Sequence, residues 1–499
     1  MTSKIPVSLI DPTGSTTGQV IQSGGSGIPP VWVVPTTSVQ PTITTLRASN
    51  SSTLGNCCIV TGYYAAGDGG GGWYVYTSSD TTSADNGGSI IVASDGRRWY
   101  LVQTTPIKAR QFGVKADGVT NDYVSLTNAI SSLPSSGGTI DCRDCQTILI
   151  GQPLNIGNGT SAVASSINGI VLLGSGGDDP FGNVGTTLKI SNAASCVVQF
   201  NGPILGGGLQ GNWIIDGNSL ATNGIIINQV ADGDFGNIAV KNCTNYFALL
   251  TNQNATDPYG GCRSNQFKSL SMSNVPSGAT GLALVATITT SPGDIIQNKF
   301  GIVDMTLATN GATGIQLGWA DFNTFDAVDI SATSGGTSIG LLLKGNDSSH
   351  VPFNNTFNCF GSSCPITTFT GQIPYGNVIL NYDFIDSNHV LPTAIGVCGT
   401  AQYIAAGMLF SATFGYAAYG WNNGSPAVPV ATGSGNSVIN SNVYPCTVYQ
   451  TGGTGVHLVD THGNDLMIGT MSTYRLLQGE KTYFSGVVPS SWAWHADVF

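Results

Sequence analysis

The sequence predicts an all-β protein built around a parallel β-solenoid. Two observations carry this prediction: a composition that disfavours long helices, and a pattern that recurs every 25 to 33 residues. Glycine accounts for 68 of the 499 residues, charged residues make up only 9%, and Glu480 is the single glutamate. Helices are normally built from Ala, Leu, Glu and Lys, whereas strands and turns favour β-branched, aromatic and turn-forming residues. The composition therefore indicates short strands separated by many turns.

The recurring pattern is Asn-x-Phe, which appears at Asn265, Asn298, Asn323 and Asn355, in steps of 33, 25 and 32 residues. A second pattern, glycine before an apolar run, interleaves with it at residues 281, 314 and 340. This period, with several short strands in each unit, is typical of a solenoid whose like residues stack about 4.8 Å apart. We therefore expect a stack of phenylalanine rings inside the solenoid and a ladder of asparagines at one of its turns.

Changes in composition divide the chain into five parts. Residues 1–38 are rich in Gly, Ser, Thr and Pro, and are expected to form an extended segment without a core of its own. Residues 39–104 hold aromatic and aliphatic runs separated by Gly-Asp-Asn clusters, which indicates a small β domain. Residues 105–395 form the predicted solenoid, residues 396–430 a connecting region, and residues 431–499 a compact C-terminal β domain.

One amphipathic helix is predicted ahead of the solenoid. Leu126, Ala129, Ile130 and Leu133 are spaced as on one helix face, after the polar start Thr-Asn-Asp. A proline and two glycines follow and end the helix. A single helix in this position indicates a cap over the end of the stack.

Charge and cysteine content exclude several classes of protein. The net charge is −11 and no basic run occurs, so nucleic-acid binding is not expected. No signal peptide and no apolar run long enough to enter a membrane are visible. The eleven cysteines are expected to be buried free thiols, as in a protein made in a reducing cytoplasm. The five histidines lack metal-binding spacing, so neither a metal nor a cofactor is expected.

Several stretches resemble parts of bacteriophage tail spikes. Residues 112–140, FGVKADGVTNDYVSLTNAISSLPSSGGTI, are similar to the opening motif of pectate-lyase-like right-handed β-helices, although CRDC follows where that family usually has a Pro-Gly turn. Residues 62–102 resemble the small domain that precedes the β-helix in tail spikes, and residues 15–33 resemble a tail-attachment segment. The C-terminal stretch that begins VYPCTVYQTGGTG resembles the small β domain that closes such spikes.

The resemblance implies a right-handed parallel β-helix with small N-terminal and C-terminal β domains and one short capping helix. It also implies a homotrimer that is made in the bacterial cytoplasm and becomes part of the virion. Residues 1–104 would attach it to phage tail or baseplate proteins, and the β-helix would bind a bacterial surface glycan, either capsule or lipopolysaccharide. Many relatives also cleave that glycan. Two alternatives stay open: a non-enzymatic structural or receptor-binding spike of the same architecture, and a polysaccharide lyase.

Asp304 and Asp329 are the candidate catalytic residues. They occur 25 residues apart in Val-Asp-Met and Val-Asp-Ile, whose apolar residues are expected to face inward. Both carboxylates would then point outward on neighbouring coils, on the order of 5 Å apart. Ser271 and Gly361 hold the same position one unit before and one unit after. Two carboxylates at this separation fit glycoside hydrolysis, with one as general acid and the other as nucleophile or base.

Trp319, Asp321 and Asp326 are the candidate substrate-binding residues. Trp319 follows a predicted strand at a turn, where its ring could stack on a sugar, and the two aspartates offer alternative second carboxylates. Simpler interpretations remain open, since outward aspartates are often solvated or ion-paired and a tryptophan at a turn often packs or contacts another chain. A trimer would also cover outward apolar residues such as Ala283 and Leu342. Lyase chemistry is less favoured, because only 16 lysines and arginines occur and no aspartate cluster resembles a calcium site.

Overall fold

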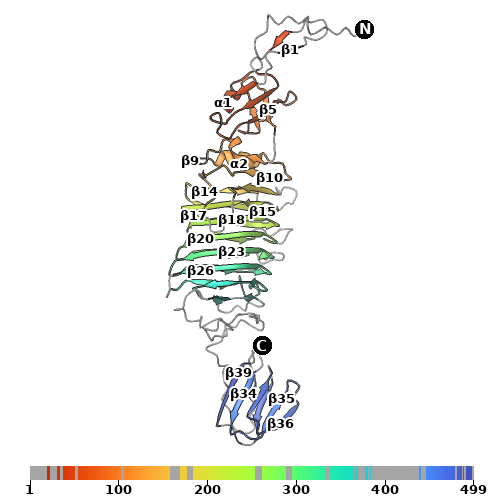
Figure 1. Ribbon diagram of the computed structural model, residues 1–499, viewed down its shortest axis with the longest axis vertical. Helices are drawn as coiled ribbons and strands as arrows, with labels where there is room; N and C mark the ends of the chain where they lie inside the picture. The colour runs from red at the N-terminus through yellow and green to blue at the C-terminus, as the bar shows by residue number, and fades with distance from the viewer. Residues whose placement is uncertain are drawn as a thin grey trace, which may run out of the picture.

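The computed structural model shows an elongated molecule in which strands dominate (Figure 1). It describes residues 20–22, 31–33, 38–50, 54–102, 106–157, 169–176, 184–252, 261–287, 295–332, 336–347, 349–364, 366–368, 377–379, 382–383, 438–439, 446–477, 480–485, 487 and 490–496. The predicted extended segment lies mostly outside these residues, and the predicted connecting region at 396–430 lies wholly outside them.

A five-stranded sheet near the N-terminus has the strand order β3-β4-β5-β7-β6. Its strands are β3 (Ser38–Gln40), β4 (Cys57–Val60), β5 (Gly72–Tyr76), β6 (Ile90–Val92) and β7 (Arg98–Leu101). The short helix α1 (Ile43–Arg47) begins at Thr42, whose side chain accepts a hydrogen bond from the backbone of Thr45. Its buried residues join a core formed around Tyr74 and Trp99, both 0% exposed. Only one helix was predicted from the sequence, so α1 is an addition.

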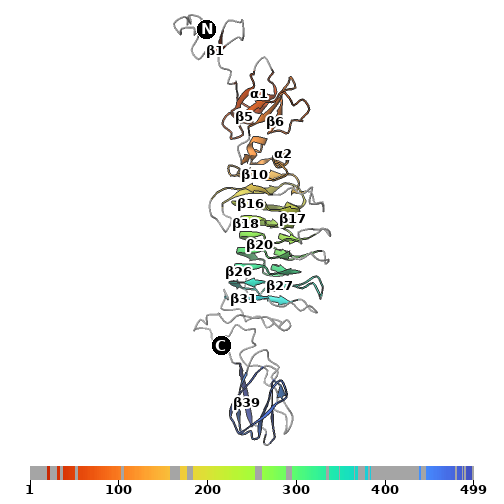
Figure 2. The same cartoon turned by 90° about the vertical axis from the view of Figure 1, so that its right-hand side faces the viewer.

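The predicted capping helix is present as α2 (Tyr123–Ser131). Leu126, Ala129 and Ile130 are buried, and they belong to the same core cluster as the coils that follow. In Figures 1 and 2, α2 lies between the N-terminal sheet and the first coils. The helix therefore covers the end of the stack, as its apolar spacing predicted.

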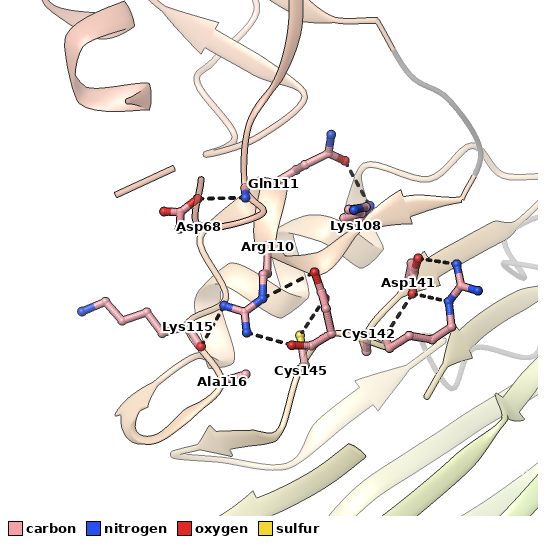
Figure 3. Close-up of polar contacts among 12 residues, drawn as sticks. Asp68, Lys108, Arg110, Gln111, Lys115, Ala116, Asp141, Cys142 and Cys145 are labelled. Carbon is pink, nitrogen blue, oxygen red and sulfur yellow. Dashed lines mark hydrogen bonds and ion pairs between the residues drawn. The ribbon is translucent and has the colours of Figure 1, made fainter. Parts of the chain in front are cut away.

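Polar contacts join the N-terminal sheet region to the start of the β-helix (Figure 3). Within the start of the β-helix, Arg110 donates from Nη2 to the backbone oxygen of Asp144 at 2.8 Å, and its Nε lies 3.5 Å from a carboxylate oxygen of the same residue. Gln111 donates from Nε2 to the backbone oxygen of Gly71 at 3.1 Å, which links the loop before β5 to the cap. The two regions are therefore connected by hydrogen bonds as well as by the chain itself.

The strands that follow pair in parallel, one coil with the next, and form the β-helix. Its strands are β8 (Ile107–Lys108), β9 (Asp117–Asn121), β10 (Gly138–Asp141), β11 (Thr147–Ile150), β12 (Leu154–Ile156), β13 (Ile170–Leu173), β14 (Thr186–Ile190), β15 (Ala194–Leu205), β16 (Gly208–Gln210), β17 (Asn212–Ala231), β18 (Asp234–Cys243), β19 (Tyr246–Thr251), β20 (Gln266–Val275), β21 (Thr280–Leu284), β22 (Ile295–Ile296), β23 (Lys299–Leu307), β24 (Thr313–Leu317), β25 (Ala320–Asp321), β26 (Thr324–Ala332), β27 (Ile339–Leu343), β28 (Thr356–Phe357), β29 (Phe360–Ser362), β30 (Ile366–Thr368), β31 (Val378–Ile379) and β32 (Tyr382–Asp383). Figure 2 shows these coils stacked along the long axis. The predicted parallel β-helix is confirmed.

The predicted phenylalanine stack runs through the centre of the β-helix. Neighbouring rings lie nearly parallel, with centroids 4.4–4.8 Å apart, through Phe235, Phe267, Phe300, Phe325 and Phe357. The centroid distances match the spacing of parallel strands, because each ring is contributed by the same position of successive coils. Each of these rings is at most 3% exposed, so the stack is part of the hydrophobic core.

The predicted asparagine ladder is also present. Each Nδ2 donates to the Oδ1 of the asparagine one coil further on, at 2.8–2.9 Å, through Asn265, Asn298, Asn323, Asn355 and Asn377. The same Oδ1 atoms also accept a backbone N–H from the preceding asparagine at 2.9–3.1 Å. These side chains are at most 8% exposed, so the ladder satisfies polar groups that the turn would otherwise bury unpaired.

Two expectations about the surface were wrong. Ala283 is 0% exposed within a single chain, so it needs no second chain to cover it, whereas Leu342 is half-buried. Among the cysteines that the structure describes, Cys57 and Cys359 are exposed free thiols, although the others are buried. The first error arose from inferring coverage from strand alternation, and the second from the usual burial of cysteine as a small apolar residue.

Besides a two-stranded antiparallel sheet of β1 (Val20–Gln22) and β2 (Val31–Val33), the described fold includes two antiparallel sheets near the C-terminus. Their strands are β33 (Val438–Ile439), β34 (Cys446–Thr451), β35 (Val456–Val459), β36 (Asp465–Gly469), β37 (Thr473–Leu476), β38 (Lys481–Phe484) and β39 (Ser491–Ala496). Val448, Val456 and Leu476 are fully buried in a small shared core. Across the described residues, no helix combines the length and apolarity needed to cross a membrane.

Candidate active site

Asp304 and Asp329 lie opposite one another on neighbouring strands. β23 and β26 pair in parallel, and their register places Asp304 against Asp329. The flanking valines are buried, Asp304 is half-buried and Asp329 is exposed. Since paired strands lie about 4.8 Å apart, the two side chains are neighbours on the outer surface of the β-helix. The predicted register and orientation are therefore confirmed.

The pair belongs to a longer column of positions that the strand register aligns, which we call the aspartate column. It comprises Ser271 on β20, Asp304, Asp329, Gly361 on β29 and Asp383 on β32. The alignment of Asp383 was not predicted, because its coil carries isoleucine instead of phenylalanine in the Asn-x-Phe pattern. A search that allowed any large apolar residue at that position would have found it.

The electrostatic environment differs between the two aspartates. Burial raises the pKa of Asp304 above the ordinary aspartate range, the negative charge of Asp329 raises it further, and a hydrogen bond from Ser271 opposes both effects. The pKa of Asp329 is also raised, by partial burial. Two separate causes thus raise the pKa of Asp304, and one of them is the negative charge of Asp329. A catalytic acid and base placed side by side need environments that affect their two pKa values differently.

Asp326 lies on β26 but outside the aspartate column. Phe325 and Val328 are both buried although two residues, Asp326 and Ala327, lie between them, so inward and outward positions do not alternate strictly in this part of the strand. Lys299 places its Nζ 3.2 Å from a carboxylate oxygen of Asp326, and Asn358 donates a hydrogen bond to the other oxygen at 2.9 Å. The structure therefore gives Asp326 partners in an ion pair and a hydrogen bond.

Trp319 and Asp321 lie at a different corner of the coil from the aspartate pair. Asp321 belongs to the short strand β25, which pairs with β22 in a separate two-stranded sheet, and it is only 3% exposed. Trp319 precedes β25, and its ring centroid lies 4.5 Å from that of His350 in an edge-on arrangement. The five residues proposed from the sequence are thus divided among three places: the aspartate pair, Asp326 with its own partners, and the corner that holds Trp319 and Asp321. Among the described residues, no three His, Cys, Asp or Glu side chains converge as a metal site would require.

Comparison with protein families identifies the N-terminal sheet region. Residues 40–104 match the family described as phage tail protein small four-stranded beta-sheet domain. Comparison with curated proteins found no match. The family match confirms the resemblance to phage tail proteins for this part of the chain.

Solved structures similar to this chain include two tailspikes and an enzyme. The tailspike of Acinetobacter baumannii phage AM24 is 13% identical, with a TM-score of 0.31, and the match covers 91% of this chain and 83% of that one. The tailspike of Acinetobacter phage vB_ApiP_P1 is 12% identical, with a TM-score of 0.37 and coverage of 89% and 90%. Pantoea stewartii WceF, described as a glycan biofilm modifying enzyme with a tailspike-like parallel β-helix, is 10% identical, with a TM-score of 0.37 and coverage of 91% and 69%.

Similarity at these TM-scores carries no argument about function, so the fold assignment rests on the strand pairing described above. The family match and the coils are independent observations, and they concern adjacent parts of one chain. Residues 40–104 therefore match the phage tail small four-stranded beta-sheet domain, and in this chain the matched segment precedes a parallel β-helix, the two-part architecture that the sequence predicted.

Proposed function

We propose that this chain is a phage tail spike that binds a bacterial surface polysaccharide and hydrolyses it at Asp304 and Asp329. The observation that carries the proposal is the register that sets these two aspartates opposite one another. Like charges directly opposite on paired strands are destabilising, so stacking does not explain why both positions hold aspartate. Their raised pKa values also support an acid and base role, because perturbed pKa values cluster at catalytic sites.

The strand spacing also suggests the stereochemistry of the reaction. Retaining glycosidases hold their carboxyl groups about 5–5.5 Å apart, close to the spacing of adjacent strands. In this scheme protonated Asp304 donates its proton to the glycosidic oxygen while Asp329 attacks the anomeric carbon. The bond to the leaving sugar breaks and a glycosyl-enzyme ester forms. Water then cleaves the ester, with ionised Asp304 accepting a proton from that water, so the starting configuration is restored.

An inverting mechanism would need a wider pair. Asp329 and Asp383 are separated by two strand spacings, about 9–10 Å, which is near the upper limit for inverting enzymes. The configuration of the first product therefore distinguishes the pair Asp304 and Asp329 from the pair Asp329 and Asp383. Proton NMR during early hydrolysis measures it, and we expect retention.

The test uses surface polysaccharide purified from a bacterium that the phage infects. Gel filtration and reducing-end assays should show depolymerisation by the wild type, and a loss of about 10²–10⁴-fold in rate for Asp304→Asn and for Asp329→Asn. Asp232→Asn is the matched control, because Asp232 is an exposed aspartate outside the column. Polysaccharide left at full length by the wild type would support the non-enzymatic spike, and unsaturated products that absorb ultraviolet light would support a lyase.

Attachment and assembly form a second part of the proposal. We propose that residues 1–104 bind phage tail or baseplate proteins, since this segment contains the family match at 40–104. We also propose a homotrimer. Cross-linking mass spectrometry of assembled virions should connect this segment to tail or baseplate proteins, and light scattering of the purified chain should give three times the monomer mass. A monomer in solution would contradict the trimer.

A further inference from the structure

Four rings gather at one corner of the β-helix, on two consecutive coils. We call them the aromatic corner: Trp319, Phe322, His350 and Phe353. They contact one another in pairs between the coils, Trp319 with His350 at a centroid distance of 4.5 Å and Phe322 with Phe353 at 6.1 Å. The pairs lie at the two ends of the short strand β25, and the cluster is distinct from the internal phenylalanine stack. Phe322 is the exposed member, whereas Trp319, His350 and Phe353 are half-buried and Trp319 packs against the main hydrophobic core.

The presence of a phenylalanine at position 322 is not explained by packing in the core. Its ring is 51% exposed, and its backbone has a φ of 52°, in the left-handed region that bulky residues rarely adopt. The equivalent residues, each directly before a ladder asparagine, are Ser264, Gln297 and Asn354, with φ of 53–58°. Polar residues thus serve this turn in the other coils, so neither the turn nor the core requires a phenylalanine. Strain of this kind is retained where it serves a function.

Polar groups lie at neighbouring positions of the same corner. His350 is held by Asp347, whose carboxylate oxygens lie 2.8 and 2.9 Å from its Nδ1, and Asp347 itself remains 49% exposed. Gln297 is exposed on the preceding coil at the position equivalent to Phe322, and Asn354 is half-exposed on the following coil. The surface therefore combines ring faces with carboxylate and amide groups that are accessible to solvent.

We propose that the aromatic corner is a carbohydrate-binding surface separate from the aspartate pair. Sugar rings present a C–H face that packs on an aromatic ring, and hydroxyls that hydrogen-bond to carboxylates and amides, which is the combination present here. Aromatic residues are also enriched at protein interfaces, so contact with a second copy of the chain is the alternative that the test below distinguishes. The proposal rests on the glycan-binding function proposed above, and it assigns that function a second contact point on the same coils.

The test measures binding in a protein that cannot cleave. In an Asp304→Asn, Asp329→Asn background, calorimetric titration with the polysaccharide purified from a susceptible bacterium should show at least fivefold weaker affinity when Phe322→Asn is added. Asparagine occupies the equivalent turn position at Asn354, so this variant should unfold at the same temperature as its parent or higher. Trp73→Ala is the matched control, because Trp73 is an exposed aromatic residue of the N-terminal sheet, at 56% exposure, and its loss should change affinity less than twofold.

Unchanged affinity with Phe322→Asn would overturn the proposal. A change in oligomeric state, measured by light scattering of the same variant, would also overturn it and assign the surface to a contact between copies. Binding and cleavage give separate answers: weakened binding by Phe322→Asn stands even if the aspartate pair proves inactive. If instead Phe322→Asn leaves binding intact while Asp304→Asn abolishes cleavage, the aromatic corner fails and the hydrolytic site remains.

Discussion

The asparagine ladder and the aspartate column are built by the same repeat, yet they differ in what stacking does to them. In the ladder, each amide donates to the next, so every added coil satisfies the one before it. In the aspartate column, two acceptor-only carboxylates face one another, and the pKa of Asp304 rises because of burial and its neighbour's charge. Stacking identical residues therefore stabilises the asparagine ladder and destabilises the pair of aspartates.

This contrast separates two reasons for a repeated residue. A ladder residue is explained by the fold, because removing it leaves buried groups without partners. The paired aspartates repel one another, so the fold does not explain why both are present. Ser271 and Gly361 show that the same position accepts uncharged residues. Variants at the two sites should therefore change stability in opposite directions.

The largest expected effect follows from breaking the ladder at Asn298. Its Oδ1 accepts from both the backbone and the side chain of Asn265, and its Nδ2 donates to Asn323 and to the backbone oxygen of Cys262. Asn298→Ala would leave several buried groups unpaired at about 1–3 kcal/mol each, so the free energy of unfolding should fall by about 3 kcal/mol or more. Urea unfolding measures this, with the exposed Asn155→Ala expected to stay within about 0.5 kcal/mol of wild type. An equal loss in both variants would contradict a specific role of the ladder.

A smaller effect of opposite sign is expected at Asp304. Because its folded-state pKa is raised, the native protein binds more protons than the unfolded chain between the ordinary and the raised value, and stability falls as pH rises through that window. Asp304→Asn removes this cost and should add about 0.2–1 kcal/mol to the free energy of unfolding near pH 7. The gain should vanish near pH 3, below the ordinary aspartate pKa of about 3.9. A variant less stable than wild type at pH 7 would show that Asp304 has a stabilising partner.

The smallest expected effect is a shift in the pH profile caused by Ser271. Its hydrogen bond to Asp304 lowers the pKa of that carboxyl, so Ser271→Ala should raise the pKa further. If protonated Asp304 is the acid, the alkaline limb of the hydrolysis rate should move to higher pH while the acid limb stays in place. The profile of kcat/KM against pH measures both limbs. A change in maximal rate without movement of the alkaline limb would contradict the assignment of Asp304 as the acid.

Sequence repeats predicted which residues would be paired where the repeats shared the period of the fold, but they did not predict contacts between positions outside that period. The offset from Asp304 to Asp329 equals one coil, so their pairing followed from counting residues. Asp321 and Trp319 are close to the pair in sequence, but a turn and a short strand take them to another corner. Proximity along the chain therefore grouped residues that the coil separates.

What the sequence determined by itself was the periodic part of the protein: the parallel coils, the phenylalanine stack, the asparagine ladder, the capping helix and the register of the two aspartates. Those features depend on contacts between equivalent positions one repeat apart, and such contacts are visible as spacing. The tertiary structure alone decided which outward side chains are covered, as at Ala283, which rings meet at the aromatic corner, and which turn forces Phe322 to a positive φ. Coverage and corner contacts join positions that are not equivalent, so no period in the sequence records them.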